Sequence, residues 1–191
     1  MKDTIAKAIR TATVPPILAI AMLLIFRFAY GNEFATIPVL ILEILFLVIV
    51  PVSAYPLSNL KKEEGKNARE QQRRLAFIMN FSGYAFALLV GIINRCSQML
   101  RIILTGYFIA VVVLTVINKV FKIRASGHAC SCVLPYLFFC YWFGMKAAII
   151  CVLLYLAEFW ASIRLKRHTV QEFLLGSVVA VIIFFLLILI F

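Results

Sequence analysis

Acidic residues and histidine are scarce in this chain of 191 residues. There are 8 Asp and Glu residues against 19 Lys and Arg, which gives a formal net charge of +11, and the only two histidines are His128 and His168. Two histidines and few carboxylates among so many cations make a poor cation cage, so no metal or other cofactor is expected. The five cysteines do not indicate a metal site either, because Cys130-x-Cys132 has the wrong spacing for a zinc knuckle. We interpret them as small packing residues.

Apolar residues are abundant, at 64% of the chain, whereas about half is usual for a soluble domain. A membrane-spanning helix needs about 20 apolar residues. Seven stretches qualify: 13–31, 35–58, 75–94, 99–120, 128–145, 146–163 and 169–191. The fifth and sixth almost touch at Gly144-Met-Lys146, which favours a tight loop between two crossings over one re-entrant hairpin. The prediction is an all-α, polytopic bundle of six to seven transmembrane helices, forming a single integral membrane domain over residues 1–191.

Little of the chain is left outside these stretches, and no internal repeat, low-complexity tract or separate soluble domain is evident. No A-x-A-like cleavage site follows the first apolar segment, so we expect no cleaved signal peptide. Residues 1–14 have the charge spacing of an interfacial helix, and residues 60–74 form a basic loop. The surplus of cations then indicates lipid headgroups or a phosphorylated substrate as partners, and not nucleic acid.

Three charged residues, Arg27, Glu43 and Glu158, lie within or near the ends of apolar stretches. We interpret them as snorkelling or paired structural charges, with a role in a relay as the alternative.

The most informative interval runs from Arg164 to Glu172, between two long apolar stretches. Helical spacing would stack Arg164, His168 and Glu172 on one face, because residues four apart lie one above the other. Charges close to the membrane are costly and therefore mark a functional site. The other histidine, His128, ends the sequence Arg-Ala-Ser-Gly-His at the start of another apolar stretch.

Counting crossings places three charged intervals on the side of the membrane that also holds the N-terminus. The intervals are 61–74, 119–128 and 164–172, and with the N-terminus they contain all 19 Lys and Arg residues except Arg27, Arg95, Arg101 and Lys146. Short loops rich in Lys and Arg stay in the cytoplasm. The sequence therefore predicts an active site on the cytoplasmic side of a prokaryotic inner membrane.

Two histidines, a carboxylate and many cations suit phosphoryl transfer through a phospho-histidine. One imidazole attacks phosphorus, oriented by the carboxylate, while the other protonates the leaving oxygen. Lys and Arg neutralise the charge on the phosphate oxygens. Ser126 and Gly127, just ahead of a predicted helix, would add backbone N–H donors at the positive end of its dipole.

These residues resemble the type 2 phosphatidic acid phosphatases (PAP2), a superfamily of lipid phosphatases with the pattern K-x6-RP, PSGH and SR-x5-H-x3-D. Ala125-Ser-Gly-His128 matches the second block with Ala for Pro, and His168-Thr-Val-Gln-Glu172 matches the end of the third with Glu for Asp. The first block is matched by the sequence from Lys66 to Arg74, with Arg74 in place of Pro. The resemblance covers roughly residues 60–180.

The resemblance implies a role for each matched residue. His168 would be the nucleophile, Glu172 its orienting carboxylate and His128 the general acid, while Lys66 and Arg73 would bind phosphate. Arg69, Lys122 or Arg124 could do the same work as Lys66 and Arg73. The third block's arginine would fall at Ser162 and is missing there, and Arg164 is the candidate to replace it.

The predicted function is metal-independent hydrolysis of a lipid or isoprenoid phosphate or diphosphate in the bilayer. Three alternatives remain open: a lipid phosphotransferase, a non-catalytic protein of the same fold that binds lipid phosphate, and a transporter. Broken helices in matching positions of two halves would favour a transporter, and no such pairing is seen. The specific lipid and the oligomeric state are left undecided.

Overall fold

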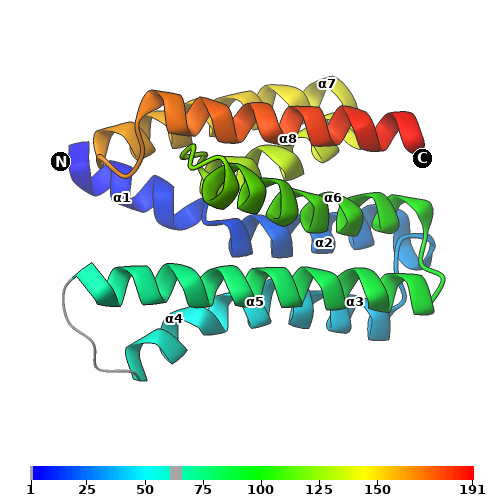
Figure 1. Cartoon of the computed structure of the whole chain (residues 1–191). Coiled ribbons are helices and arrows are strands. Elements are labelled where there is room, and N and C mark those ends of the chain that lie inside the picture. Colours follow the sequence, from blue (N-terminus) through cyan, green and yellow to red (C-terminus); the bar gives the residue numbers. More distant parts are fainter. Residues whose placement is uncertain (1, 61–65) are drawn as a thin grey trace. The chain divides into compact units, whose positions relative to one another are not determined.

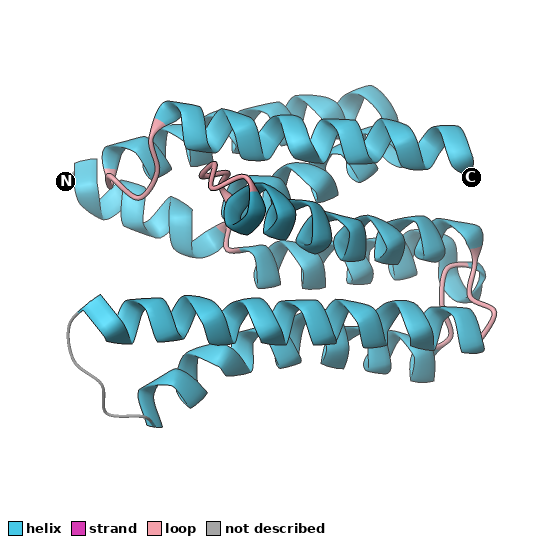
Figure 2. Ribbon diagram, viewed as in Figure 1, coloured by secondary structure: helices cyan, strands magenta, loops and turns pink. Residues whose placement is uncertain are grey.

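The computed structural model describes residues 2–60 and 66–191, and every regular element in these ranges is a helix (Figure 2). Eight α-helices are joined by short connections, with 3-10 or π-helical turns at Gly31–Glu33, Leu45–Ile49 and Val116–Val120. They are α1 (Lys2–Ala12), α2 (Pro15–Tyr30), α3 (Ile37–Ile44), α4 (Val50–Leu60), α5 (Lys66–Ile93), α6 (Gln98–Thr115), α7 (Gly127–Arg164) and α8 (Val170–Ile190). The predicted all-α class is confirmed for the described residues.

Six helical stretches of the described chain are long and apolar enough to cross a membrane. They are Pro15–Glu33, Ile37–Ser58, Arg74–Ile93, Gln98–Val120, Gly127–Arg164 and Val170–Ile190. Their positions agree with the apolar stretches seen in the sequence, except that the fifth and sixth predicted segments belong to one element, α7. The chain therefore has the helical character of an integral membrane protein.

Helix α7 is bent back on itself at Gly144, where φ is 71° and ψ is −155°, outside the helical region. A straight helix rises about 1.5 Å per residue, which would put His128 and Glu158 about 45 Å apart. Their side chains instead lie 3.0 Å apart, so residues 127–143 and 145–164 must run antiparallel to each other. Glycine suits the turn because it adopts a positive φ without strain. The turn predicted at Gly144 is confirmed.

The chain falls into two compact units, whose helices are labelled in Figure 1. The first contains the N-terminal residues through Leu18 together with Val112–Phe191, and the second is Ala19–Val111. In the first unit α7 packs against both α8 and α1, whereas in the second α5 packs against α3 and α4. The prediction of a single membrane domain stays a prediction. Both motif blocks that contain histidine belong to the first unit.

The core of the first unit supports the interpretation of its cysteines as packing residues. Cys132 and Cys151 form a buried cluster with Leu18 and Tyr136, and Cys130 is buried as well. All five cysteines are free thiols.

The second unit contains a buried carboxylate that corrects one expectation. Glu43 is 0% exposed, and neither of its carboxylate oxygens has a hydrogen-bond partner among the residues that the structure describes. It therefore neither snorkels to the interface nor pairs with another described charge. Glu158, in contrast, is paired as expected, with His128.

Replacing Glu43 by leucine should stabilise the protein. The two side chains are similar in size, and the change removes buried polar atoms whose unsatisfied state costs about 1–3 kcal/mol. We expect a higher midpoint of thermal unfolding in detergent for Glu43→Leu than for the wild type. Glu33→Leu, at an exposed position, is the control and should change the midpoint little. A lower midpoint for Glu43→Leu would show that the carboxyl group has a stabilising partner.

Candidate functional site

The second and third motif blocks meet in the first unit through their backbones. The N–H of Ser126 donates to the carbonyl oxygen of Glu172 at 2.9 Å. Gly176, one turn further along α8, lies so close to Ser126 that a Cβ there would be 2.2 Å from the Ser126 carbonyl oxygen. These contacts hold the start of α8 against the start of α7. The expected convergence of the two intervals is thus observed.

His128 lies in the first turn of α7, which begins where the sequence predicts. The hydroxyl of Ser126 accepts a hydrogen bond from the N–H of Ala129 at 3.1 Å and caps the helix. The first N–H groups of a helix have no partner within it, so Gly127 and His128 present donors suited to an anion. The expected helix start at Ser126-Gly127 is confirmed, while its role in phosphate binding stays a prediction.

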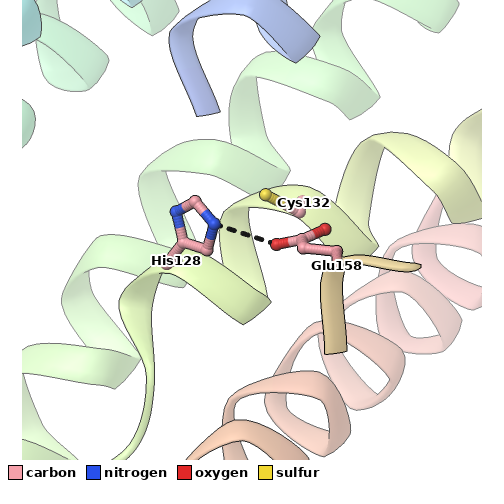
Figure 3. A group of neighbouring side chains, drawn as sticks. All are labelled: His128, Cys132 and Glu158. Atoms are coloured by element: carbon pink, nitrogen blue, oxygen red, sulfur yellow. Dashed lines mark ion pairs between the residues drawn. The ribbon is translucent and has the colours of Figure 1, made fainter. Parts of the chain in front are cut away.

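The imidazole of His128 is paired with a buried carboxylate on the returning half of α7. Its Nε2 lies 3.0 Å from Oε1 of Glu158, and the Glu158 side chain is 0% exposed (Figure 3). The hydroxyl of Tyr136 donates to the other carboxylate oxygen at 3.4 Å. In Figure 3 the Nδ1 edge of the ring lies away from Glu158. The Nε2 and Oε1 atoms are at ion-pair distance without the geometry of a hydrogen bond, so the carboxylate can orient the ring by its charge and leave Nδ1 for chemistry.

His168 and Glu172 are close together, but not for the reason expected. Helix α7 ends at Arg164 and α8 begins at Val170, so the stacking of Arg164, His168 and Glu172 on one helical face is wrong. Instead, Thr169 caps α8 in a capping box: its hydroxyl accepts from the N–H of Glu172, and the Glu172 carboxylate accepts from the N–H of Thr169, each at 3.2 Å. This brings the same carboxylate oxygen to 3.5 Å from Nδ1 of His168.

The environment of His168 favours its neutral form. Burial lowers the pKa of His168 below its ordinary value of 6.5, and the positive charge of Arg10 and the nearby His128 lower it further, while Glu172 acts in the opposite direction. A neutral imidazole with Nδ1 turned to a carboxylate has a lone pair available on Nε2. That is the state required of a nucleophile.

The N-terminal helix contributes a cation that the sequence did not indicate. Nη1 of Arg10, in α1, lies 3.4 Å from the Oγ of Ser162, the position of the third block's missing arginine. Arg164, the expected replacement, instead pairs with Asp3 at 2.8 Å and is half exposed. Arg124 is exposed, and its guanidinium lies 3.8 Å from the Glu172 carboxylate.

Lys66 and Arg73, the candidates from the first motif block, belong to α5 in the second unit. Their side chains lie outside the described part of the structure. Their assignment as phosphate ligands stays a prediction.

One group of side chains in the described chain has the composition of a metal site. His128, Cys132 and Glu158 place one ligand atom each within 4.8 Å of one another (Figure 3). Zinc would need Cys132 as a thiolate. Its Sγ instead donates a hydrogen bond to the carbonyl oxygen of Thr13 at 3.2 Å, as a protonated thiol does. The donor set therefore fits a metal poorly.

No family model matches this chain, and no curated protein or solved structure matches it either. The resemblance to PAP2 phosphatases accordingly depends on the motif residues themselves.

Proposed function

We propose that this protein is a membrane-embedded phosphatase of the PAP2 type, which hydrolyses a phosphate ester through a phospho-histidine. The observation that carries the proposal is the pair of histidine–carboxylate contacts, His128 with Glu158 at 3.0 Å and His168 with Glu172 at 3.5 Å, in one unit of the chain. A nucleophile and a general acid each need an orienting partner of this kind. The chain uses both of its histidines in such pairs.

In the proposed reaction Nε2 of His168 attacks phosphorus, and the bond from phosphorus to the ester oxygen breaks. His128 gives a proton to the departing oxygen, so the alcohol leaves neutral. Water then attacks the phospho-histidine while His128 takes up a proton from it, which releases inorganic phosphate and restores both imidazoles. Glu172 holds the N–H at Nδ1 of His168 throughout, and Glu158 holds Nε2 of His128.

The substrate class follows from the surroundings of the pairs. The start of α7 and the start of α8 adjoin apolar helices long enough to cross a membrane, which suits an amphiphile whose phosphate lies at the interface. A phosphatidic-acid-like lipid, a phosphatidylglycerol phosphate and an isoprenoid diphosphate all fit this description. We propose a prokaryotic cell membrane as the location, with the site on its cytoplasmic side because of the Lys and Arg distribution.

A metal-dependent hydrolase with His128, Cys132 and Glu158 as ligands is the less favoured alternative, because the Cys132 thiol donates to the Thr13 carbonyl. A chelator would abolish the activity of this metal-dependent enzyme, whereas it would leave the metal-independent phosphatase active. A non-catalytic protein that binds lipid phosphate, a lipid phosphotransferase and a transporter differ from both, because none of them releases phosphate to water.

A substrate panel tests the proposal directly. We expect the purified protein in detergent micelles to release inorganic phosphate from at least one lipid or isoprenoid phosphate, with the rate unchanged by EDTA. Phosphate release lost with EDTA and restored by zinc would support the metal-dependent reading instead. Binding of the panel lipids without phosphate release would contradict a phosphatase, and transfer to a second lipid would identify a phosphotransferase.

A further inference from the structure

Helix α1 is attached to the second half of α7 by polar contacts along its length. Near its start Asp3 accepts a hydrogen bond from Nε of Arg164 at 2.8 Å, and near its end Arg10 reaches Ser162. Ala6, between them, is 0% exposed. Just after the helix, the Thr13 carbonyl accepts from the Cys132 thiol. These contacts hold α1 against α7 near both of its ends.

The guanidinium of Arg10 contacts α7 one helical turn from Glu158, and its charge acts on His168. Its partner Ser162 is 0% exposed and follows Glu158, the carboxylate paired with His128, by one helical turn on the same face of α7. The same positive charge acts on the pair of His168 and Glu172, because Arg10 is the nearby cation with the largest effect on the pKa of His168. A residue 152 positions away in sequence from Ser162 thus supplies a positive charge to the site.

We propose that Arg10 binds the oxygens of the phosphoryl group in transfer, so that α1 forms one wall of the phosphate site. The inference rests on the proposed phosphatase function and deepens it. A guanidinium has five N–H donors in a planar fork and can bind two phosphate oxygens at once. Its hydrogen bond to Ser162, at 3.4 Å, holds the group against α7. Arg10 thereby fills the position that Arg164, held by Asp3, does not.

The test uses Arg10→Gln, which keeps a side chain able to donate to Ser162 but removes the charge and the fork. We expect kcat/KM for the lipid phosphate identified by the panel to fall about 100-fold or more, as for the loss of one donor to a transition-state oxyanion. Removal of the positive charge also raises the pKa of His168. The acid limb of the pH–rate profile should therefore move to higher pH.

A second variant moves the guanidinium to the opposite helix. In Arg10→Ala with Ser162→Arg, the new arginine occupies the space that the old one leaves, and most of the lost activity should return. Lys7→Gln is the matched control, because it removes an exposed cation from the same helix, and it should retain the wild-type rate. The unfolding midpoint of each variant in detergent reports any purely structural effect.

The outcomes separate this inference from the proposed function. If the wild type releases no phosphate, or if His168→Ala releases phosphate at the wild-type rate, the proposed phosphatase function is refuted. If the wild type depends on His168 but Arg10→Gln keeps its kcat/KM and its pH profile, Arg10 is not a phosphate ligand. A lower unfolding midpoint with unchanged activity per folded molecule would also overturn the inference. If Arg10→Gln does not fold, the relocated variant decides, since its failure to show activity when folded refutes the role.

Discussion

His168→Ala should reduce phosphate release to the background of the assay for every substrate that the wild-type protein hydrolyses. The reason is that the proposed mechanism gives the covalent step to His168, whose Nδ1 faces Glu172 at 3.5 Å, and gives the proton transfer to His128. Incubation with a radiolabelled substrate, followed by quenching at alkaline pH, which preserves phospho-histidine, measures the intermediate directly. Label should appear on the wild type and be missing from His168→Ala.

His128→Ala provides the contrast that assigns the two roles. A general acid contributes about 10²–10⁴-fold when the leaving oxygen needs a proton. The loss should therefore be large for a lipid phosphate, whose alcohol is a poor leaving group, and much smaller for a nitrophenyl phosphate. Equal losses on both substrates, or full activity of His168→Ala, would refute the assignment.

Much of the fold could be predicted because it depends on local composition. Apolar stretches of about 20 residues define membrane helices whatever they pack against. The turn inside α7 was also predictable, since Gly144 interrupts an apolar stretch that is too long for one crossing. Ser126 and Thr169 mark the starts of α7 and α8 as capping residues do in most helices.

The side chains that complete the site were harder to predict because their partners are distant in sequence. Glu158 and His128 meet only because α7 turns back at Gly144. No spacing in the sequence indicates which residues of the two halves of α7 lie opposite each other. Arg10 was assigned to an interfacial helix by its charge pattern. Its contact with Ser162 depends on tertiary packing of α1. The one available signal was the missing cation at Ser162, which implied a replacement but did not name it.

In the interval from Arg164 to Glu172, the predicted proximity of His168 and Glu172 is observed, but the predicted continuous helix is wrong. Helical spacing brings residues i and i+4 together, and so does a capping box, because the residue at the third position of the helix turns back toward the residues before it. The Glu172 carboxylate therefore serves the helix start and His168 together. Arg164 lies before the break between the helices and is not part of this arrangement.

Gly176→Ala should be the most damaging small substitution outside the two pairs. The added Cβ would lie 2.2 Å from the Ser126 carbonyl oxygen and 3.0 Å from its carbonyl carbon, both backbone atoms that no rotamer change can move away. Helix α8 must then shift relative to the start of α7, and that shift separates His168 from His128. Overpacking of this kind costs about 1–3 kcal/mol of stability. A misplacement of about 1 Å at an active site costs about 100-fold in rate.

The expected result for Gly176→Ala is thus a lower unfolding midpoint together with a loss of about 100-fold in kcat per folded molecule. Gly83→Ala is the matched control, because a Cβ there would lie 2.4 Å from the Phe46 carbonyl oxygen, a similar clash in the second unit. It should lower the midpoint by a similar amount while kcat per folded molecule changes far less. Equal losses of kcat in the two variants would mean that the contact between Ser126 and Gly176 has no special part in aligning the histidines. In that case general loss of packing would account for both, and the alignment of the two motif blocks would have to come from the Ser126 to Glu172 hydrogen bond alone.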